Sequence, residues 1–310
     1  MLRFIVRRIV WTIPVILLVI LLTFFMMKLI KEGPFRHERT VHPVVYAQLV
    51  RQFNLDKPWY LQYVYYVKDV FTFDLGASMR QRNRDVNDVI KEHFPVSLEL
   101  GGLALLFAIG VGIPLGIFAA LHGHGAVDYT AMAVINAGYA LPSFLVATVL
   151  IYFFAVKWAA HTPFPTNGWA GWESWVLPAI TLGFAPMAMI AQLVRGSMLE
   201  TLQQDYVRTA KAKGLRRRRV IGVHVLRNSL IPAVTAIGPL LGYLIAGSFI
   251  VETIFGIPGI GRYFIISVGS RDYTVVMGIA VLLSLIIIFA NLIVDILYGY
   301  LDPRTRDVRT

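Results

Sequence analysis

Six long stretches of this chain contain no charged residue, and they constrain its fold more than any other feature. Each is 19 to 28 residues long, and a bilayer core about 30 Å thick needs about 20 apolar residues in helical form. Because backbone groups in lipid must be hydrogen-bonded within the segment, we predict six transmembrane helices. The stretches are Ile9–Met27, Leu100–Leu121, Tyr129–Val156, Trp175–Val194, Asn228–Val251 and Tyr273–Val294.

The composition supports a membrane protein. Hydrophobic residues make up 57% of the 310 residues and charged residues 15%, whereas soluble domains carry about 25% charged residues. The mean hydropathy is +0.65. These values exclude a disordered chain and an ordinary cytosolic enzyme. The first stretch exceeds a signal-peptide core of about 7–15 residues and lacks a cleavage site, so we interpret it as a retained helix.

The lysines and arginines predict the orientation. With both termini in the cytoplasm, 15 of the 29 lie on cytoplasmic segments and three on the two short outer loops. The other 11 lie between Lys28 and Lys91, in a loop too long for the positive-inside rule. We therefore predict cytoplasmic N and C termini. The net charge of +11 reflects this topology rather than nucleic-acid binding.

The chain divides into three expected parts. Residues 1–30 form a cytoplasmic tip and the first span, residues 31–98 a helical extracytoplasmic segment, and residues 99–310 a core with five spans. Within the extracytoplasmic segment, the patterns favour helices over 44–53 and 59–73, and a third short helix over 86–93 that ends before Pro95.

The cytoplasmic segment 197–228 carries the clearest partner-binding signal. Met198, Leu202, Tyr206 and Ala210 recur every four residues, which predicts one helix with an apolar stripe. Gly214 then marks a helix end, and Arg216–Arg219 opens a second helix that leads into the fifth span. Such an element suits a groove on a partner protein.

The extracytoplasmic segment 255–272 is rich in turn-forming residues. Its glycines and Pro258 predict a tight, irregular loop on the side where a substrate or its carrier arrives.

Motifs along the whole chain resemble one family. They are Met1-Leu2-Arg3-Phe4-Ile5-Val6-Arg7-Arg8, Tyr206-Val207-Arg208-Thr209-Ala210-Lys211-Ala212-Lys213-Gly214-Leu215, Val251-Glu252-Thr253-Ile254-Phe255, Pro258-Gly259-Ile260-Gly261, Arg271-Asp272-Tyr273, Asp295-Ile296-Leu297-Tyr298 and Asp302-Pro303-Arg304. Together they resemble the inner-membrane permease subunits of dipeptide, oligopeptide and nickel ABC importers in bacteria. The resemblance implies an all-α fold of the type I ABC importer class, with transport by alternating access.

The resemblance also implies where this chain meets its partners. Arg208-Thr209-Ala210 stands where ABC permeases carry Glu-Ala-Ala, and Pro232 lies further from Gly214 than in the general consensus. The implied ATPase-coupling residues are Tyr206, Arg208, Thr209, Ala210, Ala212, Lys213, Gly214 and Leu215. The implied residues of the binding-protein or substrate loop are Gly256, Pro258, Gly259, Gly261, Arg262, Arg271 and Asp272.

The implied partners are a second, homologous permease subunit, two ATPase subunits, an extracytoplasmic binding protein and its peptide. The chain has no GxxxxGK[ST] motif, so ATP and Mg²⁺ are expected on the ATPases. The short Lys157–Ser174 loop and Gly33-Pro34-Phe35 before Glu38-Arg39-Thr40 resemble the oligopeptide subunit more than the dipeptide one. Dipeptide, nickel, haem and glutathione stay open as cargo.

Other classes of protein have weaker support. A secondary transporter would place ionisable residues at mid-membrane, and an intramembrane enzyme would place catalytic residues there. No catalytic or metal site is expected, and His122-Gly123-His124 is a weak metal motif. Glu99, Glu252 and Asp295 lie at the ends of spans, where either a structural or a gating role is open. Five glycines of the second span predict close helix packing, namely Gly101, Gly102, Gly110, Gly112 and Gly116.

Overall fold

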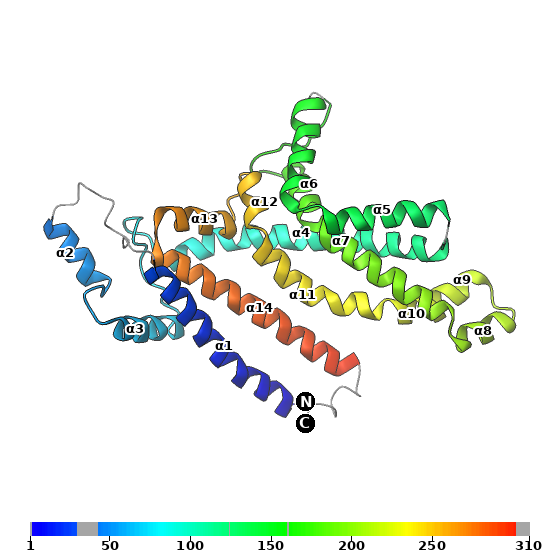
Figure 1. The fold of residues 1–310 in the computed structure, drawn as a ribbon, viewed down its shortest axis with the longest axis horizontal. Coiled ribbons are helices and arrows are strands. Elements are labelled where there is room, and N and C mark those ends of the chain that lie inside the picture. The colour runs from blue at the N-terminus through cyan, green and yellow to red at the C-terminus, as the bar shows by residue number, and fades with distance from the viewer. Residues whose placement is uncertain (1, 30–42, 124, 160, 302–310) are drawn as a thin grey trace. The chain divides into compact units, whose positions relative to one another are not determined.

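The computed structural model describes residues 2–29, 43–123, 125–159 and 161–301, and nearly all of them are helical (Figure 1). In these ranges the sole strand-like pairing is an isolated antiparallel bridge between Ala77 and Asp85. The predicted all-α class is confirmed. The α-helices are α1 (Leu2–Leu29), α2 (Pro43–Gln52), α3 (Trp59–Phe71), α4 (Val86–Leu121), α5 (Ala126–Ala140), α6 (Ser143–Ile151), α7 (Glu173–Leu202), α8 (Asp205–Ala212), α9 (Arg217–Arg219), α10 (Leu226–Ser229), α11 (Ile231–Gly247), α12 (Phe249–Ile254), α13 (Ile260–Ser270) and α14 (Tyr273–Leu301), and the π-helical segments are η1 (Tyr152–Lys157) and η2 (Val220–Val225).

The described residues contain five candidate spans and one broken span. The five lie in α1, α4, α7, α11 with α12, and α14. The third predicted stretch is not one straight helix, because Ala126–Ala140 and Ser143–Lys157 meet at 110°. Pro142 has no backbone N–H, and the preceding Leu141 is extended, with ψ of 117°. A residue before proline is driven out of the helical region in this way.

The predicted short helix over 86–93 is also corrected, because it is the first part of the 36-residue α4. Val86, Val89, His93, Ser97 and Leu100 are all buried at helical spacing. This continuous buried face crosses Pro95, so side-chain burial outweighs the backbone hydrogen bond that proline removes. The helices predicted over 44–53 and 59–73 are confirmed as α2 and α3.

The chain divides into two compact units. The first comprises Met1–Val96 and Gly259–Phe289. Its core joins Ile20 and Phe24 of α1 to Tyr66 of α3 and to Met277 and Val281 of α14. Tyr63 of α3 adds a polar contact to α1, since its hydroxyl donates to the Leu17 carbonyl at 3.0 Å.

The second unit comprises Ser97–Pro258 and Ala290–Thr310, and α7 packs at its centre. Of the most apolar 18-residue stretch of α7, 61% is buried inside the chain, whereas in α1 the corresponding share is 11%. A Cβ on Gly112 would lie 2.7 Å from the Met187 carbonyl oxygen, and one on Gly116 would lie 2.4 Å from that of Ala191. Small residues thus let α4 approach α7 closely.

The prediction of close glycine packing therefore holds for part of the set. A Cβ on Gly101 would lie 3.2 Å from Ile245, a tight contact. Gly102 and Gly110 have no atom within 4 Å of the Cβ position, so for them the prediction is wrong. The motifs Gly33-Pro34-Phe35, Glu38-Arg39-Thr40 and Asp302-Pro303-Arg304 lie outside the described residues.

Candidate functional site

The first candidate site, predicted to be cytoplasmic, is the short segment Asp205–Leu215 after α7, which we call the elbow. The predicted single helix through Met198 and Tyr206 is broken, because α7 ends at Leu202 and Gln204 is extended, with ψ of 146°. The break changes the register of the stripe. Val207 and Ala210 are buried, whereas Tyr206 is 42% exposed.

Gly214 closes the elbow as predicted, in left-handed backbone conformation with φ of +76°. The Gly214 N–H donates to the Lys211 carbonyl at 3.0 Å, and the Leu215 N–H donates to the Ala210 carbonyl at 3.4 Å. This pair of bonds is the Schellman motif, which caps a helix C-terminus and needs a residue free to adopt positive φ. No atom lies within 4 Å of a Cβ placed on Gly214, so the turn is open on its outer side.

The inner face of α8 is held against its own chain. Val207 and Ala210 are buried where α8 packs on η2, and η2 contributes the buried Val220 and Val225. The Asn228 amide donates to the Tyr206 hydroxyl at 2.9 Å, which ties α8 to α10. The buried face of α8 is therefore packed within the subunit, and its opposite face is exposed.

The outer face of the elbow is polar and basic. The exposed residues of the predicted coupling set are Tyr206, Arg208, Thr209, Ala212, Lys213 and Gly214, whereas Ala210 is buried and Leu215 half-buried. All four arginines of Arg216–Arg219 are exposed. The Arg208–Asp205 contact of 3.7 Å is fully at the surface, where such pairs add little stability.

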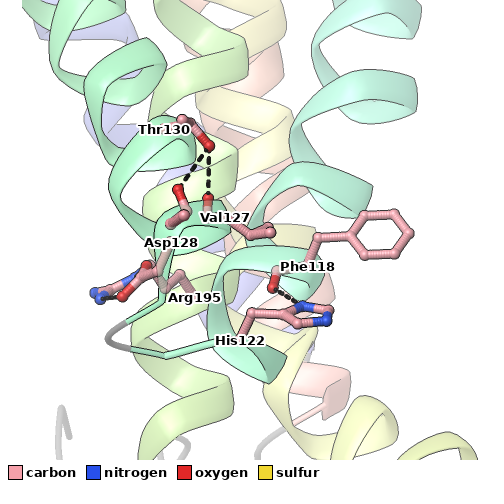
Figure 2. A network of polar contacts seen from close by, with 7 residues as sticks. Phe118, His122, Val127, Asp128, Thr130 and Arg195 are labelled. Carbon is pink, nitrogen blue, oxygen red and sulfur yellow. Dashed lines mark hydrogen bonds and ion pairs between the residues drawn. The ribbon is translucent and has the colours of Figure 1, made fainter.

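An ion pair between the half-buried Arg195 and the buried Asp128 holds the part of α7 that leads into the elbow. Figure 2 shows Arg195 of α7 directed at Asp128 in the first turn of α5. Its Nε and Nη2 donate to the two carboxylate oxygens at 2.7 and 2.8 Å, and the Asp128 side chain is 6% exposed. This bidentate contact was not predicted. The charge pattern gives no sign of it, because Arg195 closes one apolar stretch and Asp128 precedes another, 67 residues away.

The structure of the second candidate segment, residues 255–272, which is predicted to be extracytoplasmic, differs from its prediction. It was expected to be an irregular loop, but α13 occupies Ile260–Ser270. Irregular backbone is confined to its two ends. Gly259 and Gly261 are buried, Arg262 and Arg271 are half-buried, and Pro258 is exposed.

Gly256 forms a turn of the same kind as Gly214, with φ of +63°. The Ile257 N–H donates to the Glu252 carbonyl at 2.8 Å, and the Gly256 N–H donates to the Thr253 carbonyl at 3.4 Å. Here the turn is closed on its outer side, because a Cβ on Gly256 would lie 1.9 Å from Oδ1 of Asn167. The Gly168 N–H also donates to the Phe255 carbonyl at 2.8 Å.

Glu252 is fully buried beside this turn. The hydroxyls of Ser97 and Ser248 donate to its Oε1 at 2.6 and 2.5 Å, so one carboxylate oxygen joins α4 to the junction of α11 and α12. These bonds offset the cost of burying the group. Glu99 is exposed instead, and accepts a hydrogen bond from the Trp169 indole at 3.2 Å.

Arg271 and Asp272 form the other end of the segment. Arg271 is left-handed, with φ of +60°, and closes α13. Asp272 is 3% exposed, and its carboxylate accepts hydrogen bonds from the Ser78 hydroxyl and from the Met79 N–H at 3.1 Å. The Asp272 carboxylate is thus buried and hydrogen-bonded within the chain, so it is less available for direct contact with a substrate than we expected from the sequence.

Metal chemistry has no geometric support in the part of the chain that the structure describes. No group of three or more histidine, cysteine, aspartate or glutamate residues there is arranged to hold an ion. The His122 ring nitrogen Nδ1 instead lies 3.0 Å from the Phe118 carbonyl oxygen (Figure 2).

Comparison with known proteins identifies the family. Residues 112–307 match the family described as binding-protein-dependent transport system inner membrane component. Residues 1–101 match the N-terminal family of the same transport systems. The chain belongs to this family of inner-membrane transport components.

Named relatives are peptide transport permeases. The chain is 43% identical to the dipeptide transport system permease protein DppB of Bacillus subtilis over 306 residues, covering 99% of this chain and 98% of that protein. It is 39% identical to the oligopeptide transport system permease protein OppB of Escherichia coli K12 over 310 residues, covering 99% and 100%. A solved amino acid ABC transporter is similar in fold, with a TM-score of 0.50 at 16% identity, over 70% of this chain and 94% of that one.

Proposed function

We propose that this chain is one of two homologous permease subunits of an ATP-driven peptide importer in the bacterial inner membrane. Two separate ATPase subunits bind ATP and Mg²⁺, and an extracytoplasmic binding protein delivers the peptide. The relatives support peptide as cargo. Their identities do not separate dipeptide from oligopeptide, since a dipeptide permease at 43% and an oligopeptide permease at 39% are both matched over the full chain.

The observation that carries the proposal is the α8 elbow. Its buried side, Val207 and Ala210, is fixed to its own subunit, while the residues between them and around Gly214 face outward. A helix fixed on one side and exposed on the other can transmit a push from a docked protein without bending. The N-in, C-in orientation predicted from the basic residues places this elbow in the cytoplasm, where ATP is available.

The transport cycle then follows from rigid connections. Closure of the ATPases displaces the elbow, and α7 moves with it because the two are joined by Gln203 and Gln204 alone. The Arg195–Asp128 pair carries the displacement to α5. The spans of the two permease subunits alternate between inward and outward openings, and this chain performs no bond chemistry itself. The Pro258–Gly261 and Arg271–Asp272 ends of the outer segment are our candidates for handling the binding protein or its cargo.

The test compares two substitutions at Gly214 in the assembled complex. Gly214→Pro cannot adopt φ of +76° and removes the N–H that caps Lys211, so the elbow changes direction. We expect peptide uptake to fall at least tenfold while ATP hydrolysis continues. Gly214→Ala keeps the N–H and meets no neighbouring atom, so it should retain most of the uptake. Normal uptake by the proline variant would contradict the coupling role.

A further inference from the structure

A short basic loop lies at the base of α4, and its shape is fixed by hydrogen bonds. We call residues 78–84 the arginine loop. The bridge between Ala77 and Asp85 closes it, and the Ser78 N–H donates to the Arg84 carbonyl at 2.8 Å. Inside the loop, the Ser78 hydroxyl oxygen accepts the N–H groups of Arg80 and Gln81 at 3.2 and 2.8 Å. The backbone therefore has a defined turn rather than a loose connection.

Asp272 holds this loop from the other end of the chain. Its buried carboxylate takes the Ser78 hydroxyl and the Met79 N–H, 193 and more residues away in sequence. Thr274 adds a hydrogen bond from its hydroxyl to the Ala77 carbonyl at 2.8 Å. A Cβ on Gly278 would lie 2.5 Å from Val86, so α14 packs tightly at the base of the loop. Asp272 is thus a positioning residue for the arginine loop.

The tip of the loop concentrates positive charge. Arg80, Arg82 and Arg84 lie within five residues with no acidic residue among them. Arg84 is committed to the fold, because it pairs with Glu92 and its guanidinium lies 5.7 Å from the ring centroid of Tyr263. Arg82 lies at the exposed tip with Gln81 and Asn83 on either side of it. Acidic residues resume at Asp85, where α4 is about to begin.

We propose that the arginine loop is a docking element for an acidic patch on the extracytoplasmic binding protein, with Arg82 in contact and Asp272 holding the loop in position. The inference rests on the proposed function and on the predicted outward location of residues 31–98. Charge complementarity across an interface raises the association rate and fixes orientation. Lipid headgroups attract basic side chains regardless of loop shape, whereas a protein surface requires fixed positions, and a buried carboxylate fixes them here.

The test measures binding of the peptide-loaded binding protein to the complete transporter in nanodiscs of neutral lipid. Arg82→Glu should slow association about tenfold at low salt, and the difference should shrink as salt is raised. The matched control is Arg51→Glu, an exposed arginine on α2, which should bind like the wild type. Equal binding of Arg82→Glu and wild type, with complex assembly intact, would overturn the inference. So would wild-type binding that depends on anionic lipid in the nanodisc.

A double-mutant cycle tests the role given to Asp272. Asp272→Ala should weaken binding, and Arg82→Glu should then add less than a twofold further effect, because Arg82 is no longer held in place. Asp272→Asn keeps an acceptor oxygen for the Met79 N–H and should recover part of the binding. Fully additive effects would contradict the positioning role. If the wild-type complex bound no binding protein at all, the proposed function itself would fail, which is a different outcome.

Discussion

The turns at Gly214 and Gly256 have the same backbone geometry and opposite surroundings. Both close a short helix with a Schellman pair of hydrogen bonds, and both require positive φ. Beyond Gly214 there is open space, whereas Asn167 lies directly against Gly256. The backbone motif alone therefore does not distinguish a turn that is open on its outer side from one that is covered by another side chain. The side-chain environment makes the distinction.

The connections to the rest of the chain differ in the same way. Beside Gly256, the buried Glu252 is held by two serine hydroxyls, and Phe255 and Ile257 are buried. Beside Gly214, Lys213 and Arg216 are exposed cations, and the Arg195–Asp128 pair lies further up α7. We interpret the Gly256 region as a fixed structural connection. We interpret the elbow at Gly214 as the segment that transmits movement from a bound partner to α7.

The largest predicted loss of stability comes from breaking the Arg195–Asp128 ion pair, which lies in α7 before the elbow. Arg195→Met would leave the Asp128 carboxylate buried without its guanidinium, which typically costs about 3–5 kcal/mol. We expect a clear drop in thermal stability of the purified complex in detergent. The double variant Arg195→Met with Asp128→Leu should recover much of it, since both charges are then removed. Arg208→Met removes the exposed pair instead and should change stability by less than about 1 kcal/mol. Equal losses of stability in Arg195→Met and Arg208→Met would contradict the distinction between the ion pair in α7 and the exposed pair in the elbow.

The next largest loss of stability is predicted for a substitution at Gly256, where the turn is covered by Asn167. Gly256→Ala combines an unfavourable positive φ, at about 1–2 kcal/mol, with a clash against Asn167 that adds about 1–3 kcal/mol. We expect a lower unfolding temperature and poorer assembly. Adding Asn167→Gly should remove the clash and leave the backbone cost. A Gly256→Ala variant as stable as wild type would break the comparison.

The smallest loss of stability is predicted for a substitution at Gly214, where the turn is open on its outer side. Gly214→Ala meets no atom within 4 Å, so its cost should be limited to the backbone strain of about 1–2 kcal/mol, confined to the elbow. The unfolding temperature of the whole complex should shift less than for Gly256→Ala. A larger shift at position 214 than at 256 would reverse the assignment of open and filled turns.

The sequence predicted the all-α fold class, four of the six spans as single helices, a fifth that is interrupted at Ser248, and the helix end at Gly214. The length of an apolar stretch and a glycine that ends a helix are local signals, so they can be recognised in a single sequence. The 110° break at Pro142 was not predicted, because a proline within a span bends a helix by an amount that its neighbours decide. The continuation of α4 through Pro95 was missed for a related reason, since its buried face is visible only in three dimensions.

The candidate sites were predicted less completely. The residues of the elbow were located, but the break at Gln203 and Gln204 moved the buried face from Tyr206 to Val207. The partners of Asp128 and Asp272 lie 67 and 194 residues away, and single-sequence patterns carry no information on pairing at that range. The helix within segment 255–272 was not predicted, because the glycines and Pro258 near its start indicated an irregular loop.

We propose that the ATPase binds the outer face of α8, and cysteine labelling tests this contact directly. The chain has no native cysteine, so Thr209→Cys on that face gives a single reactive thiol. Phe73→Cys, at a position 82% exposed on the predicted outer side, serves as the control. We predict that a maleimide labels both thiols in the permease pair alone, and that adding the ATPase subunits protects Thr209→Cys at least tenfold and leaves Phe73→Cys unchanged. Equal labelling of Thr209→Cys with and without the ATPases would contradict the account.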